Sequence, residues 1–171
     1  MSKRGAPILH FMIFGIYSFT SMTCNADLSD LSPASACNYL ATIGLRTTTY
    51  RQQADGNYQC ITPHVDIGTA TGQNGALNNI VYYVIGKEKS IDTIQLVIDV
   101  SNPNESVAIH RRLKDVSNFL AEKLHTELPK PIQEAIAVGR DAKAVVNKRA
   151  VSVQRSNRAA NNAYSVQVVF E

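Results

Sequence analysis

The chain has four histidines, and one of them lies close in sequence to a carboxylate in a candidate loop. His64 and Asp66 are two residues apart in a glycine-bearing stretch, residues 63–79, that shows little hydrophobic periodicity. An imidazole beside a carboxylate could act as an acid–base pair. Because a histidine in a surface loop is more often only solvated, the catalytic interpretation of this pair is kept as an alternative hypothesis.

Two other pairs of ionisable residues are too far apart to act together. His110 and His125 fall in one predicted helix, about 22 Å apart along its axis, and are interpreted as surface residues beside its apolar stripe. Asp92 and Asp99 share a predicted strand but are separated by more than about 20 Å. Neither pair could hold one metal ion or act on one bond, so no metal and no cofactor are predicted.

Known catalytic signatures are absent from the sequence. It contains no His-Glu-x-x-His, Gly-x-Ser-x-Gly or Ser-x-x-Lys motif, and no Gly-Lys-Ser/Thr follows its glycines. Catalytic residues can also be assembled from scattered positions. The sequence therefore favours a noncatalytic protein without excluding an enzyme.

The first 26 residues have the pattern of a secretory signal peptide. Lys3 and Arg4 precede an apolar run at 7–19, and Cys24-Asn25-Ala26 ends the segment with small residues. An anchor is disfavoured because a membrane span needs about 20 apolar residues. A lipid on Cys24 is the other alternative, which the residues before it do not favour. We expect cleavage to leave a single domain, 27–171, with no integral membrane segment.

Cys37 and Cys60 are the two cysteines of that domain, and in an oxidising compartment they are expected to form a disulfide. The leader and this pairing together predict a periplasmic or secreted protein. The bond would join an N-terminal helix to a strand.

The charge distribution limits the class of partner. The formal net charge is +3, and loss of the two basic leader residues brings it close to neutral, which disfavours nucleic acid as the main partner. Basic residues gather between 130 and 158. Within that run Arg149, Arg155 and Arg158 are candidates for docking an acidic partner, with a solvated face as the alternative interpretation.

Binding candidates also fall in the loop at 63–79, because long polar loops are often functional. They are Thr69, Gln73 and Asn74. Tyr82 and Tyr83 are neighbours in a predicted strand and point to opposite faces, so at most one belongs to the core. The other is either an anchor for a partner or is covered by a helix.

Hydrophobic periodicity and turn signals predict an α+β fold, with an antiparallel sheet of about six strands and three helices mainly on one face, in the order α-β-β-β-β-α-α-β-β. The expected helices are 33–44, a long one that begins at Pro103 and is stopped by Pro129, and 131–139, which 141–146 could prolong. The expected strands are 45–51, 57–62, 80–86, 91–100, 149–155 and 163–170, with a possible short one at Val65 to Ile67.

These observations favour an exported, noncatalytic protein-binding domain. The most concrete hypothesis is a periplasmic immunity protein that neutralises a toxin, since small exported disulfide domains without enzyme motifs share this layout. One alternative is a small envelope hydrolase that uses His64 and Asp66. Another is an accessory subunit of an envelope assembly, in which a sheet edge pairs with a neighbour.

Overall fold

The computed structural model describes residues 27–69, 76–158 and 162–171. The predicted leader, including Cys24, lies outside these residues. The helical segments are η1 (Leu28–Asp30), α1 (Pro33–Cys37), η2 (Ala41–Ile43), η3 (Pro103–Glu105), α2 (Ser106–Lys123) and α3 (Lys130–Val138). The strands are β1 (Arg51–Gln52), β2 (Tyr58–Ile61), β3 (Val65–Ile67), β4 (Asn78–Lys87), β5 (Ser90–Val100), β6 (Ala142–Val146), β7 (Arg149–Asn157) and β8 (Tyr164–Phe170).

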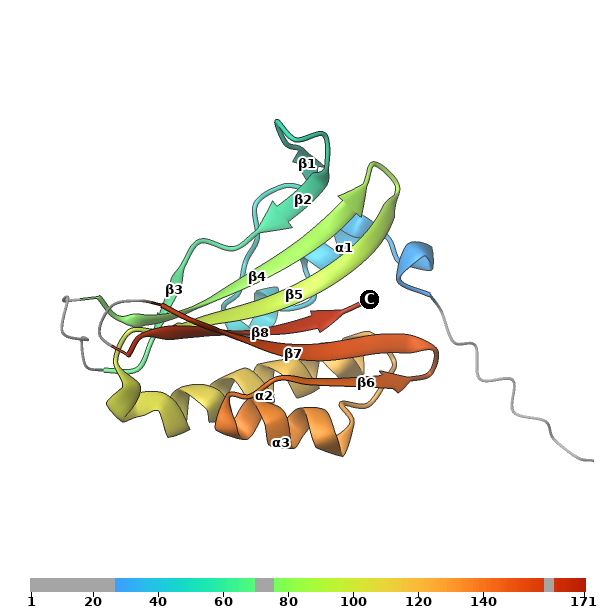
Figure 1. Ribbon diagram of the computed structural model, residues 1–171. Helices are drawn as coiled ribbons and strands as arrows, with labels where there is room; N and C mark the ends of the chain where they lie inside the picture. The colour runs from blue at the N-terminus through green and yellow to red at the C-terminus, as the bar shows by residue number, and fades with distance from the viewer. Residues whose placement is uncertain (1–26, 70–75, 159–161) are drawn as a thin grey trace, which may run out of the picture.

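The strands form one antiparallel sheet, as predicted, with α2 and α3 beneath it (Figure 1). Its order is β1-β2-β4-β5-β8-β7-β6, and β3 pairs with the same edge of β4 that β2 uses. Within the described residues the sheet has eight strands rather than about six. The α+β class is confirmed, and the two additional strands are β3 and β6.

The end of α3 explains one of these differences. Gly139 adopts a left-handed backbone with φ of 61°, which ends the helix. The chain then enters β6, where Ala142 pairs with Val153 of β7. The expectation that 141–146 could prolong this helix is therefore wrong.

The N-terminal helix and the first strand are shorter than predicted. α1 ends at Cys37, where Asn38 donates a side-chain hydrogen bond to the Ala34 carbonyl, a local bond that competes with further helix. Residues 45–50 run alongside β2 with a backbone bond from Thr48 to Ile61, but regular pairing begins only at Arg51.

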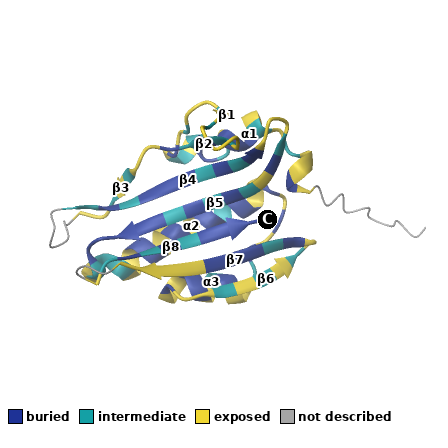
Figure 2. Ribbon diagram, turned by 45° about the horizontal axis from the view of Figure 1, so that its top comes forward, coloured by how far each residue is buried: buried dark blue, intermediate teal, exposed yellow. Residues whose placement is uncertain are grey.

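All three α-helices contribute to a core on one face of the sheet. The even-numbered residues of β4 and β8, and those of β5 from Ile94 onward, point to this face, and Tyr82, Leu96 and Val168 are fully buried there. The predicted apolar stripe of α2 is confirmed, and it buries Ile109, Leu113, Val116, Leu120 and Leu124 against the same core. Figure 2 shows the buried strands with α2 behind them.

The predicted disulfide joins Cys37 of α1 to Cys60 of β2, with 6.1 Å between the two Cα atoms. A second link lies beside it, where the Tyr82 hydroxyl donates to the Ala36 carbonyl over 2.8 Å. The short helix is thus fixed to the sheet by a covalent bond and a buried hydrogen bond.

His110 belongs to the interior, so the prediction of a surface position is wrong. Its side chain is buried between α2, the end of α3 and β8. Nδ1 faces the Ala137 carbonyl at 3.2 Å and therefore carries the proton, which leaves Nε2 to accept from the Tyr164 hydroxyl at 3.0 Å. Arg155 stacks over the Tyr164 ring at 3.7 Å from its centroid. His125, by contrast, is exposed as predicted.

This arrangement makes stability depend on pH. Burial lowers the pKa of His110 below its ordinary 6.5, and the nearby Arg155 guanidinium lowers it further, although the Ala137 hydrogen bond opposes them. The unfolded chain therefore binds a proton at higher pH than the folded protein does. We expect the free energy of unfolding to be greatest above 6.5 and to fall below it, with a limiting slope of about 1.4 kcal/mol per pH unit from this group.

Denaturant unfolding between about pH 7.5 and about pH 5 measures the effect. The variant His110→Gln keeps a polar amide but cannot titrate, so its curve should lose this contribution. His125→Gln is the matched control and should retain it. If the pH dependence of the free energy of unfolding became equally weak in both variants, it could not be assigned to His110.

Candidate functional site

The face of the sheet opposite the helices is not covered by any helix of the described residues (Figure 2). Odd-numbered residues of β4 up to Ile85, and of β5 from Thr93 to Asp99, point to it, because side chains alternate along a strand. We call this surface the uncovered face. Its middle consists of Ile61, Tyr83, Ile85, Gln95, Val97 and Gln167, which are all partly exposed.

Tyr83 lies near the centre of the uncovered face, while its neighbour Tyr82 is in the core. The two tyrosines therefore point to opposite faces as predicted. Burial and the nearby Asp99 carboxylate raise the pKa of the Tyr83 phenol above its ordinary 10.0. The hydroxyl stays protonated at neutral pH and can donate a hydrogen bond to a partner.

A row of polar side chains crosses one end of this face. Register pairs Asp66 with Asn79, Asn79 with Asp99, and Asp99 with Ser165. Residues directly opposite each other on antiparallel strands share a face, so their side chains stand side by side. We call these four residues, with His64 and Arg158, the polar row.

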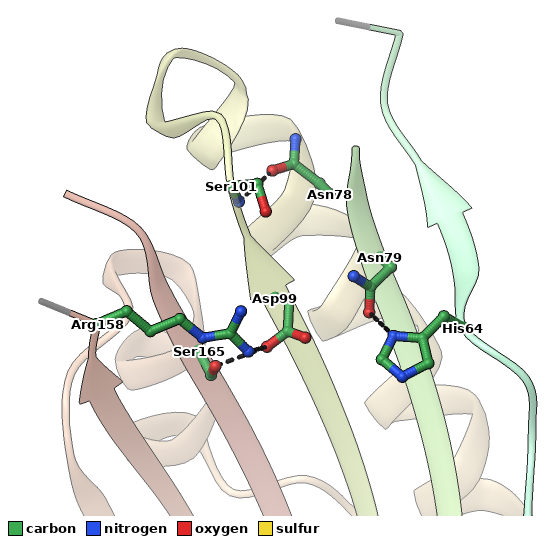
Figure 3. Close-up of polar contacts among 7 residues, drawn as sticks. All are labelled: His64, Asn78, Asn79, Asp99, Ser101, Arg158 and Ser165. Carbon is green, nitrogen blue, oxygen red and sulfur yellow. Dashed lines mark hydrogen bonds and ion pairs between the residues drawn. The ribbon is translucent and has the colours of Figure 1, made fainter. Parts of the chain in front are cut away.

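Asp99 holds one half of the polar row together. Its carboxylate accepts from Arg158 at 2.5 Å and from the Ser165 hydroxyl at 2.6 Å (Figure 3). The Asp99 side chain is mostly covered, whereas half of the Arg158 side chain faces solvent. The predicted binding residue Arg158 thus presents a cation whose position is fixed by a buried carboxylate.

His64 and Asn79 form the other hydrogen-bonded pair of the polar row. The imidazole Nδ1 lies 3.0 Å from Oδ1 of Asn79, so Nδ1 donates and Nε2 is left to accept from a partner (Figure 3). Within the described residues, neither ring nitrogen bonds to a carboxylate or a hydroxyl, and no hydrogen bond joins His64 to Asp66. The two residues share a face without forming the acid–base pair that their spacing suggested.

The start of the loop after β3 is tied to the beginning of the α2 segment. Oε1 of Glu105 accepts from both the backbone N–H and the hydroxyl of Thr69, each at 3.1 Å. Oε2 accepts from Asn78 at 3.0 Å. Gly68 has φ of 89°, and a Cβ there would overlap Glu105 Oε2, so this close approach requires glycine. Thr69 therefore anchors the loop, while Gln73 and Asn74 lie outside the described residues.

The three candidate arginines do not form one patch. Arg149 is 5% exposed and donates to the Leu124 carbonyl over 2.7 Å, so we do not include it in a binding surface. Arg155 is about 20 Å further along β7 and packs on Tyr164. Only Arg158 reaches the polar row. The three arginines of this basic run therefore lie in three different environments and do not form a common docking surface.

A family model matches residues 28–155, about three quarters of the chain. The chain belongs to DUF6030, a family of unknown function. No curated protein and no solved structure matches it.

The DUF6030 match includes most of the polar row. His64, Asp66, Asn79 and Asp99 fall inside the matched residues, whereas Arg158 and Ser165 follow them. In the described part of this DUF6030 chain, no cluster of His, Cys, Asp and Glu could hold a metal ion. No described helix has the length and apolar character needed to cross a membrane.

Proposed function

We propose that this protein is an exported, noncatalytic domain that binds a protein partner through the uncovered face of its sheet. The observation that carries the proposal is the position of Tyr83, a partly exposed aromatic residue at the centre of a face that no described helix covers. Export is supported by the disulfide and by the leader-like sequence at 1–26.

The composition of the uncovered face supports a protein rather than a small molecule as the ligand. Protein interfaces combine a central cluster rich in aromatic and apolar side chains with a polar rim. Here Tyr83, Ile85 and Val97 form the centre, and the polar row forms the rim at one end. The rim presents donors and acceptors held by hydrogen bonds within the sheet.

The hydrogen bonding of the polar row supports binding rather than catalysis. The hydroxyl of a nucleophilic triad bonds to an imidazole, which acts as its base. In the polar row the Ser165 hydroxyl donates to the Asp99 carboxylate, which also accepts from Arg158, and the His64 imidazole bonds to the Asn79 amide. The imidazole and the hydroxyl of the row are thus bonded to different partners and not to each other.

Within this class, we propose a periplasmic immunity protein as the specific role. Such a protein must cover a toxin with a rigid surface, and a disulfide-linked sheet supplies rigidity without enzymatic machinery. The Arg158–Asp99 pair would dock an acidic group of the toxin, and His64 Nε2 would accept a hydrogen bond from it.

Site-directed crosslinking in the native host tests the proposal. A photoreactive benzoylphenylalanine placed at Tyr83 should yield a discrete adduct. The same residue at Val107 or Val138, both well exposed on the helical side, should yield none. Adducts only from the helical positions would contradict binding by the uncovered face.

The identity of the captured protein decides between the roles. A purified exported toxin that is inhibited by the protein would support the immunity role, and Tyr83→Ala should weaken that binding at least about 30-fold. Capture from Tyr83 of an envelope assembly with no toxic component would overturn the immunity role and favour an accessory subunit. Turnover of an envelope substrate that is lost in His64→Ala would favour the hydrolase alternative.

A further inference from the structure

A second site lies at the other end of the molecule from the polar row. An open groove of about 720 Å³ is bounded by α1, by the extended segment 47–50 and by the turn between β4 and β5. This volume is in the range of small-molecule sites. The residues of its walls, among them Ser32, Asn38, Thr47, Thr49 and Tyr50, are mainly hydroxyl and amide side chains.

We propose that this groove binds a neutral, hydroxyl-rich ligand, namely a short stretch of an uncharged oligosaccharide. The site is separate from the uncovered face and does not depend on the protein-binding function proposed above. Three features of the groove carry the assignment, namely its free hydrogen-bonding groups, its single aromatic ring and its balanced charge.

The groove offers both donors and acceptors. Within the described residues, the hydroxyls of Ser32 and Thr49 make no hydrogen bond, so each can donate and accept. The Thr47 hydroxyl donates to the Cys37 carbonyl, and the Asn38 side-chain amide donates to the Ala34 carbonyl. The oxygen of each side chain can therefore still accept a hydrogen bond. Such mixed groups match sugar hydroxyls, which also donate and accept.

Tyr50 supplies a fixed ring. Its hydroxyl donates towards the carbonyls of Lys87 at 2.9 Å and Ser90 at 3.3 Å, so the ring is held against the β4–β5 turn. Tyr58 packs beside it, with ring centroids 5.9 Å apart. An aromatic ring with an apolar face is suited to the C–H face of a sugar ring, while the surrounding hydroxyls bind its polar edge.

The charges of the groove favour a neutral ligand. Glu88 and Lys89 are the charged residues of its wall, and their formal charges cancel. An anion such as a phosphate would meet Glu88 and would find no pair of cations. The walls are also fixed before binding, because Cys37 is joined to Cys60 and Thr47 is bonded to Cys37. This preorganisation reduces the entropy cost of binding.

Titration of the isotope-labelled protein with neutral trisaccharides, followed by amide NMR spectra, tests the site. The probes are cellotriose, maltotriose and triacetylchitotriose. At millimolar concentrations at least one should shift the amides of 32–38, 47–50 and 88–89 in a saturable way. Thr49→Val keeps the shape of the side chain but removes its free hydroxyl, and it should weaken binding about fivefold. Tyr50→Ala should abolish it.

The control is Tyr83→Ala, which removes an aromatic residue from the uncovered face and should leave sugar binding unchanged. Loss of the protein partner in Tyr83→Ala with sugar binding intact would separate the two proposals. If Tyr50→Ala folds poorly, the sugar affinity of Thr49→Val still tests the proposal. No shift with any trisaccharide, shifts outside the groove, or equal affinity in Thr49→Val and the unmodified protein would overturn the assignment.

Discussion

Replacing both Cys37 and Cys60 with alanine is expected to lower the free energy of unfolding by about 3 kcal/mol. The bond closes a loop of 23 residues, and its removal returns conformational freedom to the unfolded chain. Both side chains are buried, so alanine also loses some packing. The loss should be measured by denaturant unfolding of the two proteins under oxidising conditions.

Reductant provides the internal control for this prediction. It should destabilise the unmodified protein by a similar amount and leave the double variant unchanged. The groove beside α1 should loosen in both cases, because Cys37 belongs to its wall. If the reduced and oxidised proteins unfolded at the same denaturant concentration, the disulfide would not stabilise the fold.

The local signals of the sequence predicted most of the fold. Alternation in β4 and β5, the stripe of α2 and the two cysteines are patterns that can be recognised without tertiary contacts. The strand β6 could not be predicted in this way, because Ala-Lys-Ala-Val-Val is compatible with either a helix or a strand. The left-handed backbone of Gly139 and the pairing with β7 make this segment a strand. The burial of His110 could not be predicted locally either, because its hydrogen-bond partner Tyr164 is 54 residues away in the sequence.

The polar row was only partly predictable for the same reason. Local spacing singled out His64 with Asp66, and the basic run singled out Arg158, but nothing local connects the pair with the arginine. Their connection passes through Asn79, Asp99 and Ser165, and register across three strands brings these together. Asp99 and Arg158 are 59 residues apart. The contacts of the Glu105 carboxylate with Thr69 and Asn78 likewise join residues that are 36 and 27 positions apart.

Asn78 is expected to be the most sensitive polar position near the site. It is fully buried at the start of β4, and its Oδ1 accepts from the backbone N–H of Ser101 at 2.8 Å (Figure 3). The same oxygen accepts from the backbone N–H of Asn102 at 2.9 Å. Its amide group donates to Glu105. Asn78→Ala leaves two buried donors and a carboxylate without this partner, so we expect a loss of about 3 kcal/mol in the free energy of unfolding.

Asn79→Ala is the matched control, because it removes the next residue of the same type in the same strand. Asn79 is partly exposed and its side chain bonds to the exposed His64, so water can replace that bond and the loss should stay below about 1 kcal/mol.

The two variants should also separate stability from binding. Asn79→Ala should weaken partner capture from Tyr83 while the fold persists, since it releases His64 from the polar row. Equal stability losses in the two variants would contradict the role assigned to Asn78, because they would show that its buried bonds contribute no more than a solvent-exposed one.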